Sequence, residues 1–184
     1  MDSTAEACKR LAKAIAGSGI KAPMFGGFVL PLYGVERMTL DMDFLLAECD
    51  LPPFEKVLAT IGYEKVFRSA QYAKFRHPSP EVLDVDTVFA DPATIEIICQ
   101  TATMRQLAGA SFLCVSLDTL IGTKLHAVRH NEERRGYKDF NDILELIAAN
   151  SIDPHAKHFQ DMCLKYGTDE IYQRVLTEVA RDAQ

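Results

Sequence analysis

Two aspartates separated by one residue, Asp41 and Asp43, are the residues of this sequence whose type and spacing point most directly to chemistry. In a β-strand, residues two positions apart project from the same face, so the two carboxylates would lie side by side. Like charges at this separation repel each other, and a divalent cation between them would offset the repulsion. Because Mg²⁺ prefers carboxylate oxygens together with waters and substrate phosphates, the pair predicts a site for Mg²⁺ or Mn²⁺.

A glycine pair, Gly26-Gly27, precedes these acids. Glycines carry no side chain, so their backbone N–H groups can approach a phosphate closely. The apolar run over residues 28–33 predicts a short helix there, in which Pro31 is tolerated if it lies in the first turn. The sequence therefore predicts a phosphate-binding turn just upstream of the metal site.

Two strands must hold the carboxylates. Over residues 38–47, polar Thr39, Asp41 and Asp43 alternate with apolar residues, which predicts one buried face and carboxylates on the other. A second apolar strand is predicted over residues 82–89, and it carries Asp84 and Asp86 on one face. Both strands thus offer acids.

The remaining pattern predicts a mixed arrangement of strands and helices. Further strands are predicted over residues 63–68, 71–76 and 112–115, and helices over 4–16, 53–61, 93–107, 116–130 and 138–149, with two more beginning at 153 and at 168 or 169. We therefore expect an α+β fold: a small mixed β-sheet with helices packed on it and a helical C-terminal part. The expected division is a core over residues 1–115 and a helical region over 116–184, with a single domain as the alternative.

Composition limits the classes of partner. The formal net charge of −6 argues against coating of nucleic acid by bulk electrostatics, although a local basic patch could still bind an RNA end. No apolar run approaches the roughly 18 residues of a membrane span, and the first residues lack a secretory signal, which predicts a cytoplasmic location and no membrane partner. The odd number of cysteines, with no C-x-x-C pair, favours reduced thiols over disulfides or zinc ligands.

Residues 26–44, GGFVLPLYGVERMTLDMDF, resemble the glycine-glycine, short helix, R-x-T-x-D-hydrophobic-D signature of the nucleotidyltransferase superfamily, and within it the AbiEii-type branch. Residues 116–127 and 135–143 resemble the downstream "Leu-Ile-x-x-Lys-Leu … Lys-Asp-x-x-Asp" region of that branch. The family often carries serine at the second glycine of its first motif. Gly27 stands there in this chain, which leaves only backbone amides for phosphate binding.

The resemblance implies transfer of a nucleoside monophosphate from an NTP to an acceptor, with Mg²⁺ or Mn²⁺ as cofactor and release of pyrophosphate. It implies that acids of both strands serve as catalytic residues and metal ligands. The third carboxylate would be Asp86, with Asp84 as the alternative. The catalytic residues would be Asp41, Asp43, Asp86 and Lys124, and the first three would hold the metal. The nucleotide- and phosphate-binding residues would be Gly26, Gly27, Arg37, Thr39, Lys124 and Asp139.

Several alternatives stay open. Lys124 could be a solvated helix residue, Arg37 could pair with Asp41 or Glu36, and Asp139 could orient Lys124 instead of touching substrate. The acceptor could be tRNA, if the chain is the toxin of a toxin-antitoxin pair with a cognate antitoxin. It could also be a small molecule such as an aminoglycoside, or a protein side chain. A nucleotidyltransferase-like domain that binds nucleotide or a partner without turnover is the non-catalytic alternative.

Overall fold

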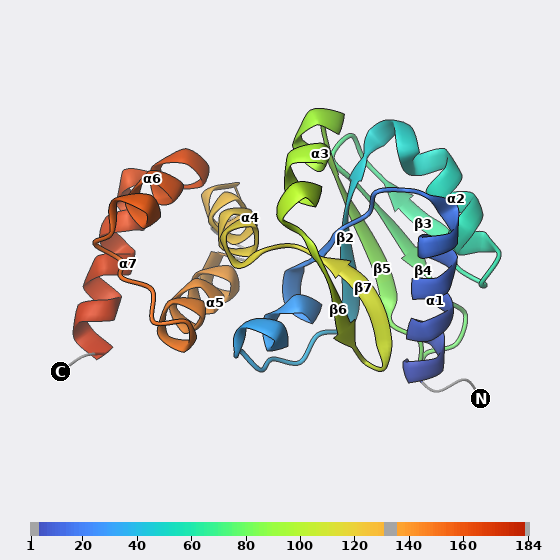
Figure 1. The fold of residues 1–184 in the computed structure, drawn as a ribbon, viewed down its shortest axis with the longest axis horizontal. Helices are drawn as coiled ribbons and strands as arrows, with labels where there is room; N and C mark the ends of the chain where they lie inside the picture. The colour runs from blue at the N-terminus through green and yellow to red at the C-terminus, as the bar shows by residue number, and fades with distance from the viewer. Residues whose placement is uncertain (1–3, 131–135, 183–184) are drawn as a thin grey trace. The chain divides into compact units, whose positions relative to one another are not determined.

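The computed structural model describes residues 4–130 and 136–182. Within them, the chain divides into two compact units. The first unit contains the residues up to Val29 together with Met38–Ser116, and the second contains Leu30–Arg37 together with the residues from Leu117 onward. The first unit carries the β-sheet and the second is helical (Figure 1).

The first unit is built on a mixed seven-stranded sheet in the order β3-β4-β5-β2-β1-β7-β6. The strands are β1 (Met24–Phe25), β2 (Asp41–Ala47), β3 (Glu64–Arg68), β4 (Tyr72–Arg76), β5 (Asp84–Ala90), β6 (Thr103–Leu107) and β7 (Ala110–Cys114). The pairs β2–β5 and β1–β7 are parallel, and the other pairs are antiparallel. The predicted α+β class with a mixed sheet is therefore confirmed.

Helices cover this sheet on both sides. They are α1 (Thr4–Ser18), α2 (Leu51–Ala59) and α3 (Pro92–Thr101), and the one-turn 3₁₀ helix η2 (Glu48–Asp50) precedes α2. In Figure 1, α1 and α2 lie beside one face of the sheet and α3 lies beside the other. Phe54 of α2 is buried with its ring centroid 6.0 Å from that of Phe44 and 6.2 Å from that of Phe75. This packing makes the β2 face opposite Asp41 and Asp43 the core of the unit.

The helix predicted after the glycine pair is present as the 3₁₀ helix η1 (Gly26–Tyr33). Pro31 lies inside this helix beyond its first turn, so the helix forms without the first-turn position that was expected to be needed for a proline. A proline there removes one backbone donor, which costs less in a 3₁₀ segment built of short consecutive turns than in a long α-helix. Backbone bonds from Gly34 to Pro31 and from Val35 to Leu30 close its end.

The structure corrects several predicted boundaries. Strand β2 begins at Asp41 instead of Met38, and Leu40 is 74% exposed. The second half of the helix predicted over 93–107 is wrong, because α3 ends at Thr101 and the following residues form β6. The third C-terminal helix begins at Lys157 instead of residue 153. In β6, antiparallel pairing with β7 overrides the local pattern, as non-local partners often do.

The second unit contains α4 (Leu117–His130), α5 (Gly136–Ala149), α6 (Lys157–Tyr166) and α7 (Asp169–Asp182). The segment Leu30–Arg37 belongs to the same unit. The Asn150 side-chain amide donates a hydrogen bond to the Tyr33 carbonyl at 2.9 Å, which anchors this segment beside the end of α5. Among the described residues, no helix combines the length and the apolar character that crossing a membrane would require.

The cysteines are unpaired thiols, as the sequence predicts. Cys8, Cys114 and Cys163 are buried. Burial raises the pKa of the Cys114 thiol to about 11 and that of Cys163 to about 12. Both thiols therefore stay protonated and unreactive at neutral pH.

Candidate active site

Three carboxylates gather on one face of the sheet, where β2 lies beside β5. Asp43 and Asp86 are register partners in these parallel strands, and Asp41 lies two residues before Asp43. One oxygen of each of the three lies within 4.8 Å of the others. Asp84 is the register partner of Asp41 but is not part of this group, and its carboxylate accepts a hydrogen bond from Arg76 Nε at 3.2 Å. We call Asp41, Asp43 and Asp86 the acid cluster.

Two other predicted residues adjoin the acid cluster. The Thr39 hydroxyl donates a hydrogen bond to Asp41 Oδ1 at 2.7 Å, so it orients that carboxylate. Gly26 has a φ of +75°, and a Cβ placed on it would lie 2.1 Å from Asp43 Oδ2. A glycine is therefore required here to leave space for the Asp43 carboxylate as well as for the backbone conformation. Gly27 follows in η1 and is buried, and its contact with phosphate stays a prediction.

We expect Gly26→Ala to weaken Mn²⁺ binding by about tenfold or more, the usual effect of disturbing a residue that positions a metal ligand. The added methyl group would displace the Asp43 carboxylate. The matched control is Gly19→Ala, since Gly19 has a similar φ of +71° but no atom within 4 Å of its added Cβ. Mn²⁺ titration followed by electron paramagnetic resonance measures both affinities, and equal affinities would show that the contact with Asp43 is unimportant.

Lys74 on β4 is a cation of this site that the sequence did not reveal. It is the register partner of Asp86, and its Nζ lies 2.5 Å from Asp86 Oδ2. Asp86 is itself largely buried, with 9% of its surface exposed. Alternation along β4 indicates which face Lys74 occupies, but only the pairing of β4 with β5 brings it to Asp86. Lys74 therefore orients the third carboxylate.

The donor set of the acid cluster fits a small divalent cation. All the candidate ligands are carboxylate oxygens, which suit Mg²⁺ and Mn²⁺ and not the softer metals that prefer thiolate or imidazole. Lys74 pairs with one of the three carboxylates, Asp86. A divalent cation bound to the acid cluster would offset the repulsion among the carboxylates.

Three other predicted residues, Arg37, Lys124 and Asp139, form an ion network in the helical unit. Lys124 Nζ lies 2.5 Å from Asp142 Oδ2 and 3.2 Å from Asp139 Oδ1, and Lys124 is only 3% exposed. Arg37 Nη1 lies 2.9 Å from Asp142 Oδ2. Lys124 is thus a buried ion-pair partner and not a solvated helix residue, and Arg37 pairs with Asp142 instead of Asp41 or Glu36.

Asp142 is the residue of this network that the predicted site omitted. It is 2% exposed and contacts both cations, so it links α4, α5 and the segment Leu30–Arg37. Its spacing of three residues from Asp139 on one helix was the available signal. The distance of Asp139 from Lys124 agrees with an orienting role, while contact of either residue with nucleotide stays a prediction.

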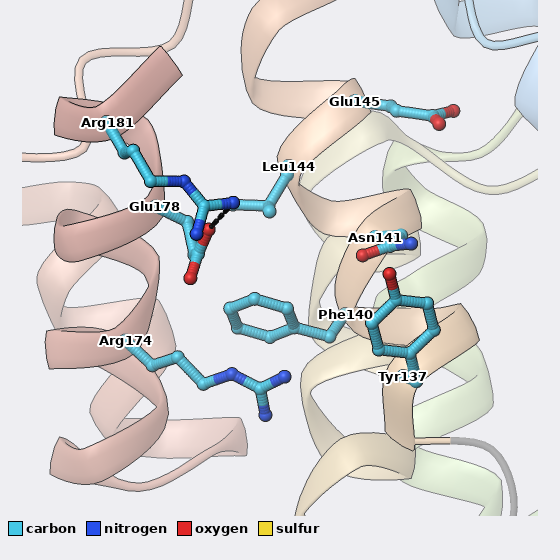
Figure 2. Close-up of a pocket in the computed structure, with 8 residues that line it drawn as sticks. All are labelled: Tyr137, Phe140, Asn141, Leu144, Glu145, Arg174, Glu178 and Arg181. Carbon is cyan, nitrogen blue, oxygen red and sulfur yellow. Dashed lines mark ion pairs between the residues drawn. The ribbon is translucent and has the colours of Figure 1, made fainter. Parts of the chain in front are cut away.

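A pocket of about 460 Å³ lies between α5 and α7 (Figure 2). The Arg174 guanidinium carbon lies 3.9 Å from the centroid of the Phe140 ring, and Arg181 pairs with Glu178 at 2.6 Å. Two arginines and two glutamates line this pocket, so its charge favours neither anions nor cations. No predicted site residue lines it.

Solved structures of similar fold include an adenylyltransferase and a nucleotidyltransferase-like protein. ANT(2″)-Ia in complex with adenylyl-2″-tobramycin is 14% identical with a TM-score of 0.63, over 85% of this chain and 92% of that chain. An antigenic nucleotidyltransferase-like protein from Paracoccidioides brasiliensis is 16% identical with a TM-score of 0.55, over 98% and 88% of the two chains. The lincomycin-bound lincosamide antibiotic adenylyltransferase LnuA is 14% identical with a TM-score of 0.51, over 74% and 92%. These matches show a nucleotidyltransferase fold.

The family described as "Uncharacterised nucleotidyltransferase" matches residues 2–181. The chain therefore belongs to this family and is a nucleotidyltransferase enzyme. Comparison with curated proteins gives no match. The superfamily predicted from residues 26–44 is confirmed, whereas the AbiEii-type branch stays a prediction.

Proposed function

We propose that this chain transfers a nucleoside monophosphate from an NTP to an acceptor hydroxyl at the acid cluster, with Mg²⁺ or Mn²⁺ as cofactor. The observation that carries the proposal is the convergence of the three carboxylates from β2 and β5. Gly26 supports it, because its missing side chain leaves space for one of those carboxylates.

The proposed reaction divides the work between the cofactor and the protein. A bound divalent cation would neutralise charge on the NTP phosphates and orient them for in-line attack. The acceptor oxygen forms a bond to the α-phosphorus while the bond to the bridging oxygen breaks, and pyrophosphate leaves with that electron pair. The Asp86 carboxylate, oriented by Lys74, takes the acceptor proton.

We propose that the backbone amides of Gly26 and Gly27 contact the NTP phosphates, as their position at the start of η1 allows. We propose that Arg37, Lys124 and Asp139 also contribute to nucleotide binding. Because Lys124 is buried and paired with Asp139, we favour an indirect contribution, in which this pair holds α4 and α5 in place.

For the acceptor we favour a small hydroxylated molecule. One protein of similar fold is in complex with adenylyl-2″-tobramycin, and another is a lincosamide antibiotic adenylyltransferase with lincomycin bound. The net charge of −6 opposes binding of a polyanion. The competing proposal is a tRNA acceptor and a toxin role with an antitoxin. It is supported by the resemblance of the residues around Lys124 and Asp139 to the AbiEii-type branch.

The proposed function is tested by incubating the protein with Mg²⁺ and each NTP labelled at the α- or the γ-phosphorus. The acceptors are supplied separately as an aminoglycoside and lincosamide mixture and as total tRNA. We expect a product that carries the α-label, equimolar pyrophosphate, and no product when the metal is chelated. The control is the Asp41→Ala/Asp43→Ala variant, and equal transfer by this variant would exclude both acids as metal ligands. Product from the γ-label would indicate a kinase instead.

A further inference from the structure

An exposed apolar surface lies on the same face of the sheet as the acid cluster. Phe67, Tyr72 and Val88 are 46%, 36% and 37% exposed. The rings of Phe67 and Tyr72 are stacked, with centroids 5.2 Å apart and an interplanar angle of 28°. We call these three residues the ring platform. Single exposed apolar residues are ordinary, but a stacked pair beside a third apolar side chain forms a surface on which a flat ring can rest.

Strand register connects the ring platform to Asp86. Tyr72 pairs with Val88 across β4 and β5, and the next same-face pair is Lys74 with Asp86. Lys74 lies between the acid cluster and the ring platform, because its Nζ contacts Asp86 and lies 5.9 Å from the centroid of the Tyr72 ring. A molecule bound to the platform would therefore lie two residues along β5 from Asp86, the carboxylate proposed to take the acceptor proton.

We propose that the ring platform is the acceptor subsite of this enzyme, and that the acceptor is a small alcohol with a ring beside its reacting hydroxyl. The inference rests on the proposed function, since it assumes that Asp86 faces the acceptor. The platform holds the ring by stacking and apolar contact, which positions the hydroxyl for deprotonation.

Charge on this face selects against polyanionic acceptors. Four aspartates share the face, Asp41, Asp43, Asp84 and Asp86, and two of them pair with the described cations Lys74 and Arg76. Both cations already pair with acids, at 2.5 Å for Lys74 and 3.2 Å for Arg76. Neither cation is therefore free to pair with a phosphate backbone, whereas an uncharged ring stacked on the platform needs no ionic partner.

The test measures binding to the full chain without NTP or metal, so its result is independent of catalysis. The probe is phenyl β-D-glucopyranoside, an uncharged ring-bearing alcohol, followed by chemical-shift changes in the protein NMR spectrum. We expect shifts centred on Phe67, Tyr72 and Val88. Because each aromatic contact contributes modestly, Phe67→Ala/Tyr72→Ala should weaken binding by about fivefold or more.

Two further variants separate ring contact from misfolding. Tyr72→Phe keeps the ring and should retain binding, and Ile97→Ala removes an apolar side chain that is 63% exposed on α3 and should leave binding unchanged.

Chemical-shift changes centred on other residues would overturn the proposal, as would equal weakening of glycoside binding by Ile97→Ala. Tighter binding of a uridine decanucleotide would indicate a nucleic-acid surface, and a concentration-dependent dimer lost in Phe67→Ala/Tyr72→Ala would indicate a self-association surface. If nucleotidyl transfer is absent but the glycoside still binds here, the proposed function fails and the platform remains a ring-binding site.

Discussion

Replacing Asp86 with asparagine should lower the rate of nucleotidyl transfer by about a thousandfold, within the range that loss of a general base produces. The substitution keeps the size of the side chain but removes the negative charge that attracts a divalent cation and the acceptor proton. It also leaves Lys74 facing a neutral amide instead of a carboxylate. We expect weaker Mn²⁺ binding in the same variant, which electron paramagnetic resonance would measure without any substrate.

The matched control is Asp84→Asn. Asp84 lies on the same face of β5, two residues before Asp86, but it pairs with Arg76 and is not part of the acid cluster. We expect its transfer rate and Mn²⁺ affinity to stay close to those of the original protein. The reverse result, in which Asp84→Asn is inactive and Asp86→Asn is active, would make Asp84 the third carboxylate.

Replacing Lys124 with methionine should lower the free energy of unfolding by about 3–5 kcal/mol, the usual effect of removing one partner from a buried ion pair. Lys124 and Asp142 are 3% and 2% exposed. Methionine fills a similar volume, but it leaves Asp142 with Arg37 alone and removes the ammonium from Asp139. Urea denaturation followed by circular dichroism measures the change, and it suits a chain that contains no tryptophan.

The control for this prediction is Lys157→Met. Lys157 also forms an ion pair within the helical unit, with Asp161 at 2.9 Å, but its side chain is 83% exposed. An exposed pair contributes about 0–1 kcal/mol, so this variant should remain nearly as stable as the original protein. Similar losses in both variants would mean that the network around Lys124 contributes no more than a surface pair.

The sequence could predict the parts of the site whose geometry depends only on residues that are neighbours along the chain. Asp41 and Asp43 share a face because strands alternate, and Gly26 at the start of a turn was identifiable from its position. Lys74 and the ring platform were not identifiable, because their place beside Asp86 depends on the register between β4 and β5. Register across strands is set by tertiary packing, which no local pattern specifies.

The same physical reason explains the errors in the fold. The residues after α3 were expected to continue the helix, but pairing of β6 with β7 makes them a strand. The grouping of the segment Leu30–Arg37 with the helical unit depends on contacts of the same kind, such as that of Arg37 with Asp142, more than a hundred residues away in sequence. Contacts over such separations become visible only in the folded chain.

The most direct test of the central claim is a crystal structure of this chain with Mn²⁺ and a non-hydrolysable ATP analogue. We expect anomalous scattering from Mn²⁺ bound to oxygens of Asp41, Asp43 and Asp86, with the analogue's phosphates coordinated to the same metal. Metal bound elsewhere, or an analogue that binds without contact to the acid cluster, would contradict the assignment of these carboxylates as the nucleotidyl-transfer site.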